Sequence, residues 1–410
     1  MAIDITNVLD ALQRKISSFD SSGDTFDLQY LLSSALRADR SSTIVYDTQQ
    51  DLPDLLSDSD FAGRENLAYV RSVETVYFKD YTNRLWKPLP GLNSFLGDTA
   101  GFTAGGWQPG SLNEIESFSF ANDVNGASDW GDLSQAGYNQ IGFSDRGGGF
   151  GYSILGTGGS TYIDQFPTVS PGNATDVANL GSNPNPYTNA PIRNNIGAHS
   201  YISGFNFHHE NPGVNNVRID EFPFASNATS SAWPGEIFPS PTLKNYYGES
   251  SNDHGSGYAW LTGLNFSPTA PTTDAKKFSY TSATTASPVR TLIPGIAHVN
   301  SNVSSNTHGY HCSGFTGSPP LGDNRVFKFP FALGDADTTA TQVGDLASPI
   351  YLATSQSSLT AGYITGSADV SAPSTFDIRK IIFSSDTQTA AIVSGLVGNT
   401  QQGQGSGHQF

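Results

Sequence analysis

The sequence predicts an all-β fold in which one small group of strands is repeated six times. The clearest copy lies within residues 326–366, where an alternating aromatic piece, 327–331, is followed by two shorter pieces, 343–346 and 362–366. Turn-forming residues bound each piece, as they bound short strands generally. The composition agrees, because 43 of the 410 residues are glycine and only 14% are charged, which suits many short strands and turns better than long helices.

Related copies of the first two pieces recur along most of the chain. In each copy the second piece begins 11 to 14 residues after one hydrophobic residue of the aromatic piece, namely Phe118, Phe166, Phe222, Phe278, Phe329 or Ile381. So constant a gap indicates a structural repeat. The aromatic pieces are 115–120, 162–167, 219–224, 276–280, 327–331 and 378–383, and the second pieces are 130–133, 177–180, 233–237, 289–292, 343–346 and 393–396.

The third piece ends in glycine and sets the period of the repeat. Successive glycines lie 48 to 59 residues apart, and an aromatic residue precedes each of them by a few places. A period of about 50 residues with several strands per unit is typical of a kelch-type propeller blade. Residues 98–410 therefore resemble a six-bladed kelch-like β-propeller with one four-stranded sheet per blade. The glycines are Gly105, Gly156, Gly204, Gly263, Gly314 and Gly366, and the aromatic residues are Phe102, Tyr152, Tyr201, Trp260, Tyr310 and Tyr363.

The alternation within the aromatic piece predicts where its side chains pack. Residues i and i+2 of a strand point to the same face, so Phe222 and Phe224 share a face, as do Phe329 and Phe331. We expect these four side chains to fill the space between neighbouring sheets, at roughly 1.5–3 kcal/mol for each buried side chain. A carbohydrate-stacking strip is the functional alternative, but the regular spacing favours core packing.

The end of the sequence predicts how the repeats close on themselves. Residues 401–410 are similar to residues 355–362, which lead into another blade, whereas no strand in register precedes Phe102. We therefore expect this tail to supply the innermost strand of the first blade. Joining the two ends of the repeat region in one sheet would leave no open sheet edge there.

Residues 1–97 divide into two further segments. Residues 1–40 carry two short apolar stripes at helical spacing, and residues 41–97, a β collar, contain a strand at 42–46 and a hairpin that turns near 80–83. Two such helices cannot bury their apolar faces by themselves. We therefore expect an anchor for a second copy or another protein, and the alternative is a helical hairpin folded onto the propeller. The stripe residues are Ile5, Val8, Leu9, Leu12, Leu28, Leu31 and Leu32.

Short motifs in the collar and in the repeats resemble one group of proteins. After the helical leader come Leu-Pro-Asp at 52–54, Ala-Tyr-Val at 68–70 and Val-Tyr-Phe at 76–78. This arrangement resembles the collar of virion structural proteins from marine tailed bacteriophages, cyanophages especially. Motifs such as Phe-Pro-Phe-Ala at 329–332 and His-Gly-Tyr at 308–310 also occur in that group. The resemblance implies localisation in the virion, attachment to other virion proteins through the N-terminal segment, and a homo-oligomer, for which we expect a trimer.

Charge and cysteine content exclude several classes of protein. The chain has 37 acidic and 20 basic residues, a net charge of −17, which is the opposite of a nucleic-acid-binding footprint. No basic segment followed by an apolar run opens the sequence, and no apolar stretch of about 18 residues occurs, so neither a signal peptide nor a membrane span is predicted. The single cysteine, Cys312, cannot form an intrachain disulfide, and we expect it to be a small buried residue.

Few residues are candidates for metal binding. His208 and His209 are adjacent in a predicted strand and point to opposite faces, so they cannot both easily ligate one metal ion. The acidic loop 334–339 offers oxygen ligands to calcium, but a solvated turn is the preferred interpretation. We expect no metal and no cofactor. Three further acidic residues in comparable turns are interpreted in the same way: Asp123, Asp176 and Asp386.

Propeller enzymes impose requirements that the sequence does not meet. A copper radical oxidase needs a cysteine joined to a tyrosine beside two histidines, whereas Cys312 falls within a regular repeat strand. A sialidase needs three convergent arginines, and most arginines here lie in or beside repeated strands. We therefore predict a structural protein rather than an enzyme, and two alternatives stay open: a glycan-binding module for a host surface, and an enzyme that acts on glycans. The candidate binding residues in the long loops are Tyr246, Tyr247, His208 and His209.

Overall fold

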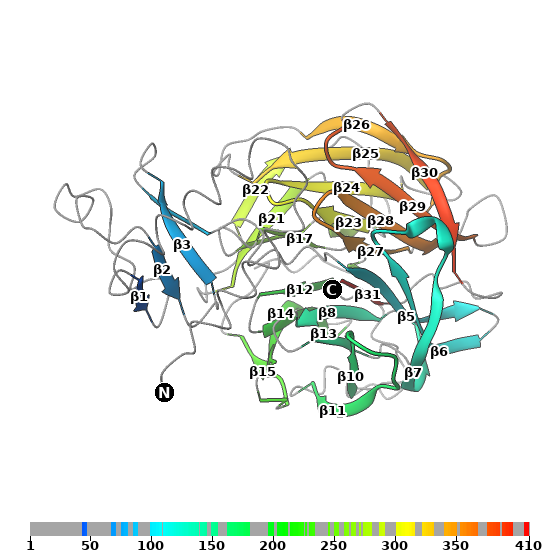
Figure 1. Ribbon diagram of the computed structural model, residues 1–410, viewed down its shortest axis with the longest axis horizontal. Coiled ribbons are helices and arrows are strands. Elements are labelled where there is room, and N and C mark those ends of the chain that lie inside the picture. Colours follow the sequence, from blue (N-terminus) through cyan, green and yellow to red (C-terminus); the bar gives the residue numbers. More distant parts are fainter. Residues whose placement is uncertain are drawn as a thin grey trace. The chain divides into compact units, whose positions relative to one another are not determined.

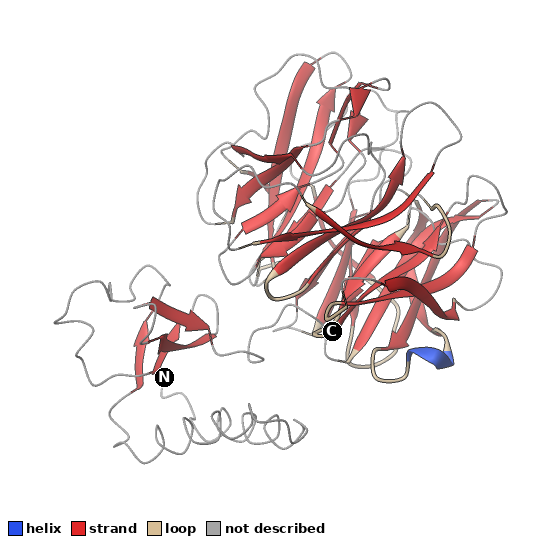
Figure 2. Cartoon of the chain, turned by 90° about the horizontal axis from the view of Figure 1, so that it is seen from above, coloured by secondary structure: helices blue, strands red, loops and turns tan. Residues whose placement is uncertain are grey.

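The computed structural model consists of two compact units, residues 1–94 and residues 95–410. In the first unit it describes residues 43–46, 67–70, 75–80 and 85–88, and from residue 99 to residue 409 it describes the strands of the second unit with most of their short turns. These parts are drawn in colour in Figures 1 and 2. The longer segments outside the described residues are 1–42, 47–66, 89–98, 181–195, 234–244, 292–300 and 397–405.

A four-stranded sheet is the described part of the first unit. β1 (Thr43–Tyr46) is parallel to β2 (Leu67–Val70), and β3 (Thr75–Asp80) and β4 (Leu85–Pro88) follow antiparallel in chain order. The strand and the hairpin predicted for this segment are confirmed, because β3 pairs with β4 across the turn that follows β3. The predicted helical anchor lies outside the described residues, together with Ile5, Val8, Leu9, Leu12, Leu28, Leu31 and Leu32.

The described strands of the second unit form six four-stranded groups, which we call sheets 1 to 6. Sheet 1 has the order β31 (Ser406–Gln409), β5 (Ala100–Gln108), β6 (Gly110–Ser119) and β7 (Ser128–Gly137), with a short 3-10 helix, η3 (Asp123–Asn125), after β6. Sheet 2 consists of β8 (Ile141–Asp145), β9 (Phe150–Ile154), β10 (Tyr162–Pro167) and β11 (Thr175–Asn179). Sheet 3 consists of β12 (Ile196–His199), β13 (Ser203–Asn211), β14 (Val214–Pro223) and β15 (Ser231–Ala232).

The remaining sheets follow the same antiparallel plan. Sheet 4 consists of β17 (Ser250–Asp253), β18 (Tyr258–Leu261), β21 (Asp274–Ser279) and β22 (Ser287–Thr291). Sheet 5 consists of β23 (Ser301–Ser304), β24 (His308–Phe315), β25 (Gly322–Pro330) and β26 (Thr341–Leu346). Sheet 6 consists of β27 (Thr354–Ser357), β28 (Ala361–Ser367), β29 (Thr375–Ile382) and β30 (Gln388–Gly395). The predicted all-β class is confirmed.

Two features depart from six separate four-stranded sheets. β26 pairs in parallel with β30, so that sheets 5 and 6 form one continuous eight-stranded sheet. In addition, β16 (Asn245–Tyr246), β19 (Leu264–Ser267) and β20 (Ala270–Pro271) form a small three-stranded sheet of their own. The sequence repeat predicted neither of them.

The first strands of the six sheets, which we call the inner strands, contact one another in a closed cycle. β31 contacts β8, β8 contacts β12, β12 contacts β17, β17 contacts β23, β23 contacts β27, and β27 contacts β31 again. Figure 1 shows β8, β12 and β31 towards the middle of the second unit and the last strands β7, β11 and β26 at its periphery. We call these last strands, with β15, β22 and β30, the outer strands.

The tail occupies the place that the sequence predicted for it. β31 pairs antiparallel with β5, and Ser406, His408 and Gln409 lie opposite Ala104, Phe102 and Gly101. Sheet 1 therefore combines three consecutive strands near residue 100 with one strand from beyond residue 400. This confirms the predicted pairing of the tail with the strand of Phe102.

The alternating aromatic pieces pack between neighbouring sheets, as predicted. Phe222 and Phe224 of sheet 3 are almost fully buried, and both ring centroids lie close to Tyr152 of sheet 2, at 5.2 and 5.1 Å. Phe329 of sheet 5 lies 5.9 Å from Trp260 of sheet 4. These side chains form apolar clusters in the interior of the unit rather than a ligand-stacking strip. The predicted burial of the lone thiol is also confirmed, because Cys312 on β24 is fully buried.

One alignment of the repeats is corrected by the strand register. Gly204 pairs with Phe222, as Gly101 pairs with Phe118 and Gly309 with Phe329. Gly204 therefore corresponds to Gly101, whereas the sequence repeat had aligned it with Gly105. The aromatic residue of this copy is Phe205, which stacks on Tyr280 of sheet 4 at 5.4 Å, and Tyr201 lies outside the described residues.

Candidate functional site

Polar side chains of the inner strands bind the backbone of the neighbouring inner strand. The N–H of Asn252 donates to Ser304 Oγ at 2.9 Å, and the N–H of Ser304 donates to Ser357 Oγ at 2.9 Å. The N–H of Ser357 donates to Gln409 Oε1 at 2.6 Å, and the N–H of Gln409 donates to Ser144 Oγ at 3.1 Å. We call this chain of four bonds the inner ladder. It runs without interruption from sheet 4 through sheets 5, 6 and 1 to sheet 2.

A second set of bonds satisfies the carbonyl groups on the same edge. Ser250 Oγ donates to the carbonyl of Gly197 at 2.7 Å, and Ser355 Oγ donates to the carbonyl of Asn302 at 2.6 Å. An inner strand has no further strand beside it, so its edge would otherwise leave backbone groups unpaired. Because a buried unpaired backbone group costs roughly 1–3 kcal/mol, these side chains stabilise the closed cycle.

Sheets 6 and 1 are also joined by a buried glutamine. Gln356 on β27 is 1% exposed, and its Nε2 donates to the carbonyl of Phe102 on β5 and to Thr365 Oγ1, both at 3.0 Å. Gly407 on β31 lies against β27 so closely that a Cβ there would collide with the carbonyl oxygen of Ser355. The contact between these two sheets thus depends on an amide at one position and on the lack of a side chain at the other.

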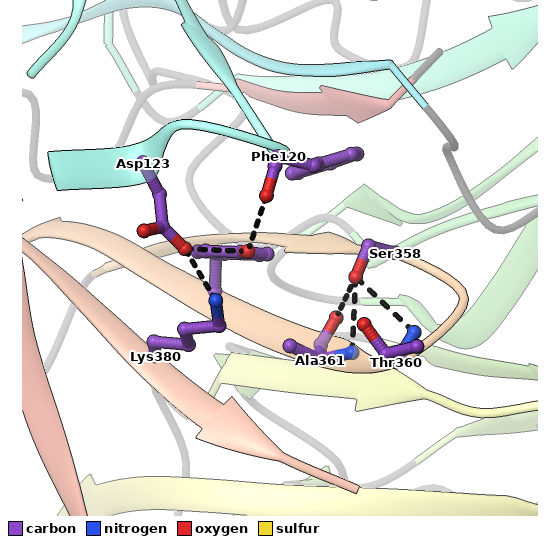
Figure 3. A network of polar contacts seen from close by, with 7 residues as sticks. Phe120, Asp123, Ser358, Thr360, Ala361 and Lys380 are labelled. Atoms are coloured by element: carbon purple, nitrogen blue, oxygen red, sulfur yellow. Dashed lines mark hydrogen bonds and ion pairs between the residues drawn. The ribbon is translucent and has the colours of Figure 1, made fainter. Parts of the chain in front are cut away.

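A second polar cluster, which we call the Asp123 cluster, joins the same two sheets at another place (Figure 3). Asp123 Oδ2 accepts a hydrogen bond from the hydroxyl of Tyr363 at 2.8 Å and forms an ion pair with Lys380 Nζ at 2.6 Å. Asp123 lies in η3 after β6, whereas Tyr363 and Lys380 lie opposite each other on β28 and β29. The side chain of Asp123 is 10% exposed and that of Lys380 is 27% exposed.

The surroundings of Tyr363 keep its hydroxyl protonated. Its ring stacks on Phe120 of sheet 1, with centroids 5.0 Å apart and planes inclined by 20°. Burial raises the pKa of Tyr363 above its ordinary value, and the hydrogen bond to the carboxylate of Asp123 raises it further. The hydroxyl is therefore a donor over the whole physiological pH range, which suits a fixed link between sheets. The adjoining turn is fixed by Ser358 Oγ, which accepts from the N–H of Ala361 at 2.9 Å (Figure 3).

The same arrangement recurs between sheets 2 and 3. Tyr152 stacks on Phe224 with centroids 5.1 Å apart, and its hydroxyl lies 3.3 Å from Asn227 Oδ1. Gln165 Nε2 donates to the same hydroxyl at 2.7 Å. Burial is the main reason that the pKa of Tyr152 is raised to about 12. In both copies the acceptor follows the stacked Phe by three residues, Asp123 after Phe120 and Asn227 after Phe224.

The candidate binding residues that the structure describes lie in strands of two different sheets and not in the long loops predicted for them. His208 and His209 are successive residues of β13, opposite Arg218 and Val217 of β14. Tyr246 lies on β16, opposite Leu264 of the small three-stranded sheet. The fourth candidate, Tyr247, lies outside the described residues.

Two ion pairs are described in the repeats, Asp123–Lys380 and Asp377–Arg379. Asp123 was interpreted as part of a solvated turn, and this is wrong, because it is buried and paired with Lys380. Asp176 is exposed, as predicted, but it lies in strand β11 and not in a turn. Asp386 lies outside the described residues. Among the arginines, Arg379 on β29 is fully buried, and its Nη2 lies 3.0 Å from Asp377 Oδ2.

Within the strands and turns that the structure describes, no group of three or more His, Cys, Asp or Glu side chains is placed to hold a metal ion. The loop 334–339, the candidate for calcium, lies outside them. No helix in the described part of the chain has the length and hydrophobicity that crossing a membrane requires.

The sequence analysis missed the residues that join the sheets. Ser304, Ser357 and Gln409 recur at steps of 53 and 52 residues, so the period of the repeat contained the signal. Serine and glutamine side chains do not stand out as catalytic groups, and the hydrophobic pattern does not mark them.

No protein-family model matches the chain, and none of the curated proteins matches it.

Proposed function

We propose that residues 98–410 form a six-bladed kelch-like β-propeller in which sheets 1 to 6 are the blades. The closed cycle of contacts among the inner strands supports this architecture. The pairing of β31 with β5 supports closure of the first blade by the tail. The parallel pairing of β26 with β30 is an additional link between the fifth and sixth blades.

We further propose that the protein is a non-enzymatic structural component of a tailed-phage virion. Residues 1–40 attach it to other virion proteins and to its own copies, and the propeller is displayed for assembly and for contact with a host surface. The inner ladder is the observation that carries this proposal, because the polar side chains at the centre of the unit bind neighbouring strands. The side chains of the ladder thus have the structural role that a display scaffold requires. The virion setting is supported by the resemblance of the collar and repeat motifs.

Localisation in intact particles tests the virion role. Antibodies raised against the second unit should label a discrete structure of purified tailed-phage particles in electron microscopy. Quantitative mass spectrometry of the same particles should find the chain at a fixed ratio to the other structural proteins. Presence of the chain only in the soluble fraction of infected cells would overturn the virion role.

Substitutions in the apolar stripe test the attachment role. Leu12→Asp in the full chain places a charge on the face predicted to be buried, so we expect loss of the trimer and of incorporation into particles. Gln13→Asp introduces the same charge one residue away, off the stripe, and should preserve both. Sedimentation of the purified chains measures the oligomeric state. A trimer that tolerates Leu12→Asp would contradict attachment through this face.

A further inference from the structure

β31 differs from the other inner strands in how it is connected. In sheets 2 to 6 the second strand begins four or five residues after the inner strand ends, as β28 begins at Ala361 after β27 ends at Ser357. β31, by contrast, pairs with β5, which lies about three hundred residues earlier in the chain. Only non-covalent contacts hold β31 beside β5. It can therefore leave its place without unfolding a hairpin.

The contacts described for β31 are polar or backbone contacts. Its residues Ser406, Gly407, His408 and Gln409 include no aliphatic side chain. Besides the ladder to β5, the strand is held by Gln409, which accepts from the N–H of Ser357 and donates its own N–H to Ser144. Each such bond replaces a bond to water, so its net contribution to stability is small. A short strand held in this way can exchange far more readily than one that buries apolar side chains.

The place that β31 occupies, between β27 and β8 along β5, is selective for its sequence. Gly407 is required where the strand passes the carbonyl of Ser355, because a Cβ would collide there. Two residues later, Gln409 is long enough to reach the N–H of Ser357. An occupant therefore needs a glycine followed two places later by a long amide. β31 of any copy of this chain meets the requirement.

We propose that β31 exchanges between copies, so that β31 of one molecule completes sheet 1 of a second molecule. The contacts are identical within one molecule and between two, so the balance depends on protein concentration and on the tether. β30 ends at Gly395 and β31 begins at Ser406, and the eleven Cα-to-Cα steps between these residues reach at most about 40 Å when extended. The inference rests on the closed architecture of the proposed function but not on the virion role. It gives the protein a second route to self-association, separate from residues 1–40.

Disulfide trapping with full-length chains tests the exchange. Ala104 and Ser406 are partners across β5 and β31, and partners in an antiparallel pair lie within disulfide range. One tagged chain carries Ala104→Cys and a second, untagged chain carries Ser406→Cys, both with Cys312→Ala. The two are mixed, incubated at several concentrations and oxidised. The matched control places Ala100→Cys and Ser119→Cys on separate chains, because these partners lie on β5 and β6, which are consecutive in the sequence.

Exchange predicts a disulfide between the tagged and the untagged chain. Its yield should exceed that of the β5–β6 control and rise roughly tenfold between about 10 and 100 µM protein, as a bimolecular exchange requires. A single chain carrying both Ala104→Cys and Ser406→Cys should form the bond internally. If the internal bond forms and the intermolecular bond stays at the level of the control, the exchange is overturned. If the internal bond does not form, the pairing of β31 with β5 is contradicted, and the exchange with it.

Discussion

Each inner strand and each outer strand of the second unit lies at an edge of its own sheet. The backbone N–H and C=O groups at the inner and outer edges find their hydrogen-bond partners by partly different means. On the inner edge, side chains such as Ser304 and Ser357 bind the backbone of the next strand. The outer edge uses both side chains and backbone. The N–H groups of Asp132 and Ser134 on β7 donate to Asn173 Oδ1 and Asp164 Oδ2, at 3.1 and 2.7 Å. The N–H groups of Gly172 and Ala174 donate to the carbonyls of Trp130 and Asp132 on β7, at 2.9 and 2.7 Å, and β26 forms a parallel ladder with β30.

The difference shows how distance from the centre changes what the sequence must supply. Inner strands lie close together, so one hydroxyl or amide can bridge two of them, and the edge selects residue types. At the outer strands, segments of main chain also bridge neighbouring sheets, as residues 172–174 do beside β7. The outer edge therefore selects backbone conformation as well. Gly131 illustrates this, because its φ is +155° and a Cβ there would collide with the carbonyl oxygen of Gly172.

The largest expected effect tests the outer edge. Gly131→Ala should lower the free energy of unfolding by about 2–4 kcal/mol, since it combines an unfavourable φ with a clash against main chain that cannot move aside easily. Urea denaturation of the full chain measures the effect. Gly395→Ala is the matched control, because a Cβ there would meet the carbonyl of Phe376 at an ordinary 3.5 Å. Equal stability of the two variants would show that the outer edge is not tightly bridged.

Alkaline pH tests the buried tyrosines independently of the hydrogen bonds at the inner and outer edges. Unfolded tyrosine loses its proton near pH 10, whereas burial raises the pKa of Tyr152 to about 12 and also raises that of Tyr363. Between these values the folded protein binds more protons than the unfolded one, so stability is complete below pH 10 and falls as the pH rises. For Tyr152 the loss is on the order of 2 kcal/mol by pH 12.

Comparison with a phenylalanine variant shows how much of this loss of stability is due to Tyr152. Tyr152→Phe removes one of the two hydroxyls whose pKa is raised. The stability of this variant should therefore fall less steeply than that of the wild-type chain between pH 10 and 12. Ser304, Ser357 and Gln409 have no proton to lose in this range, so the inner ladder does not contribute to the slope. Denaturant titrations at a series of pH values provide the measurement. Identical slopes for the two chains would contradict the raised pKa of Tyr152.

The next effect tests the inner edge. Ser357→Ala removes the acceptor of the Ser304 N–H and should cost about 1 kcal/mol, with a range of roughly 0.5–2 kcal/mol. Ser304→Ala should cost about the same, because it removes the acceptor of the Asn252 N–H. Ser394→Ala is the control, since its hydroxyl has no partner among the described residues. A loss of stability in the control that equals the loss in the other two variants would refute a specific role for the ladder.

The sequence predicted those parts of the fold that are repeated and apolar. Phe222, Phe224 and Phe329 could be placed between sheets because a strand alternates its faces and because the pieces recur with the period of the sheets. The tail could be placed beside Phe102 because it is similar to the lead-in of another copy. The alignment failed at Gly204, since the register of a strand is set by its partner, Phe222, and not by the distance to the previous glycine.

The Asp123 cluster could not be predicted from local sequence. Asp123 follows a strand in a short polar segment, and the same pattern is typical of solvated turns. Its partners Tyr363 and Lys380 lie more than two hundred residues away, and only the closed cycle brings them to it. The parallel link between β26 and β30 was missed for a related reason, because a pair of outer strands leaves no periodic signal.

The smallest effect compares the two tyrosine clusters. Asp123→Asn keeps an acceptor for the hydroxyl of Tyr363, as Asn227 provides one for Tyr152, and removes only the charge opposite Lys380. Because Lys380 is partly exposed, we expect a loss below about 1 kcal/mol, and about 1–2 kcal/mol for Asp123→Ala, which removes the acceptor too.

A double-mutant cycle isolates the ion pair of this cluster. Combining Asp123→Asn with Lys380→Met should give a coupling energy of about 0.5–1 kcal/mol that decreases in high salt, because salt screens a partly exposed pair. The inner ladder contains no charges, so Ser357→Ala should have the same effect at low and high salt. A coupling energy of zero would mean that Asp123 acts only as the acceptor for Tyr363. The clusters at the junctions of sheets 6 and 1 and of sheets 2 and 3 would then be equivalent in function, with Asp and Asn interchangeable three residues after the stacked Phe.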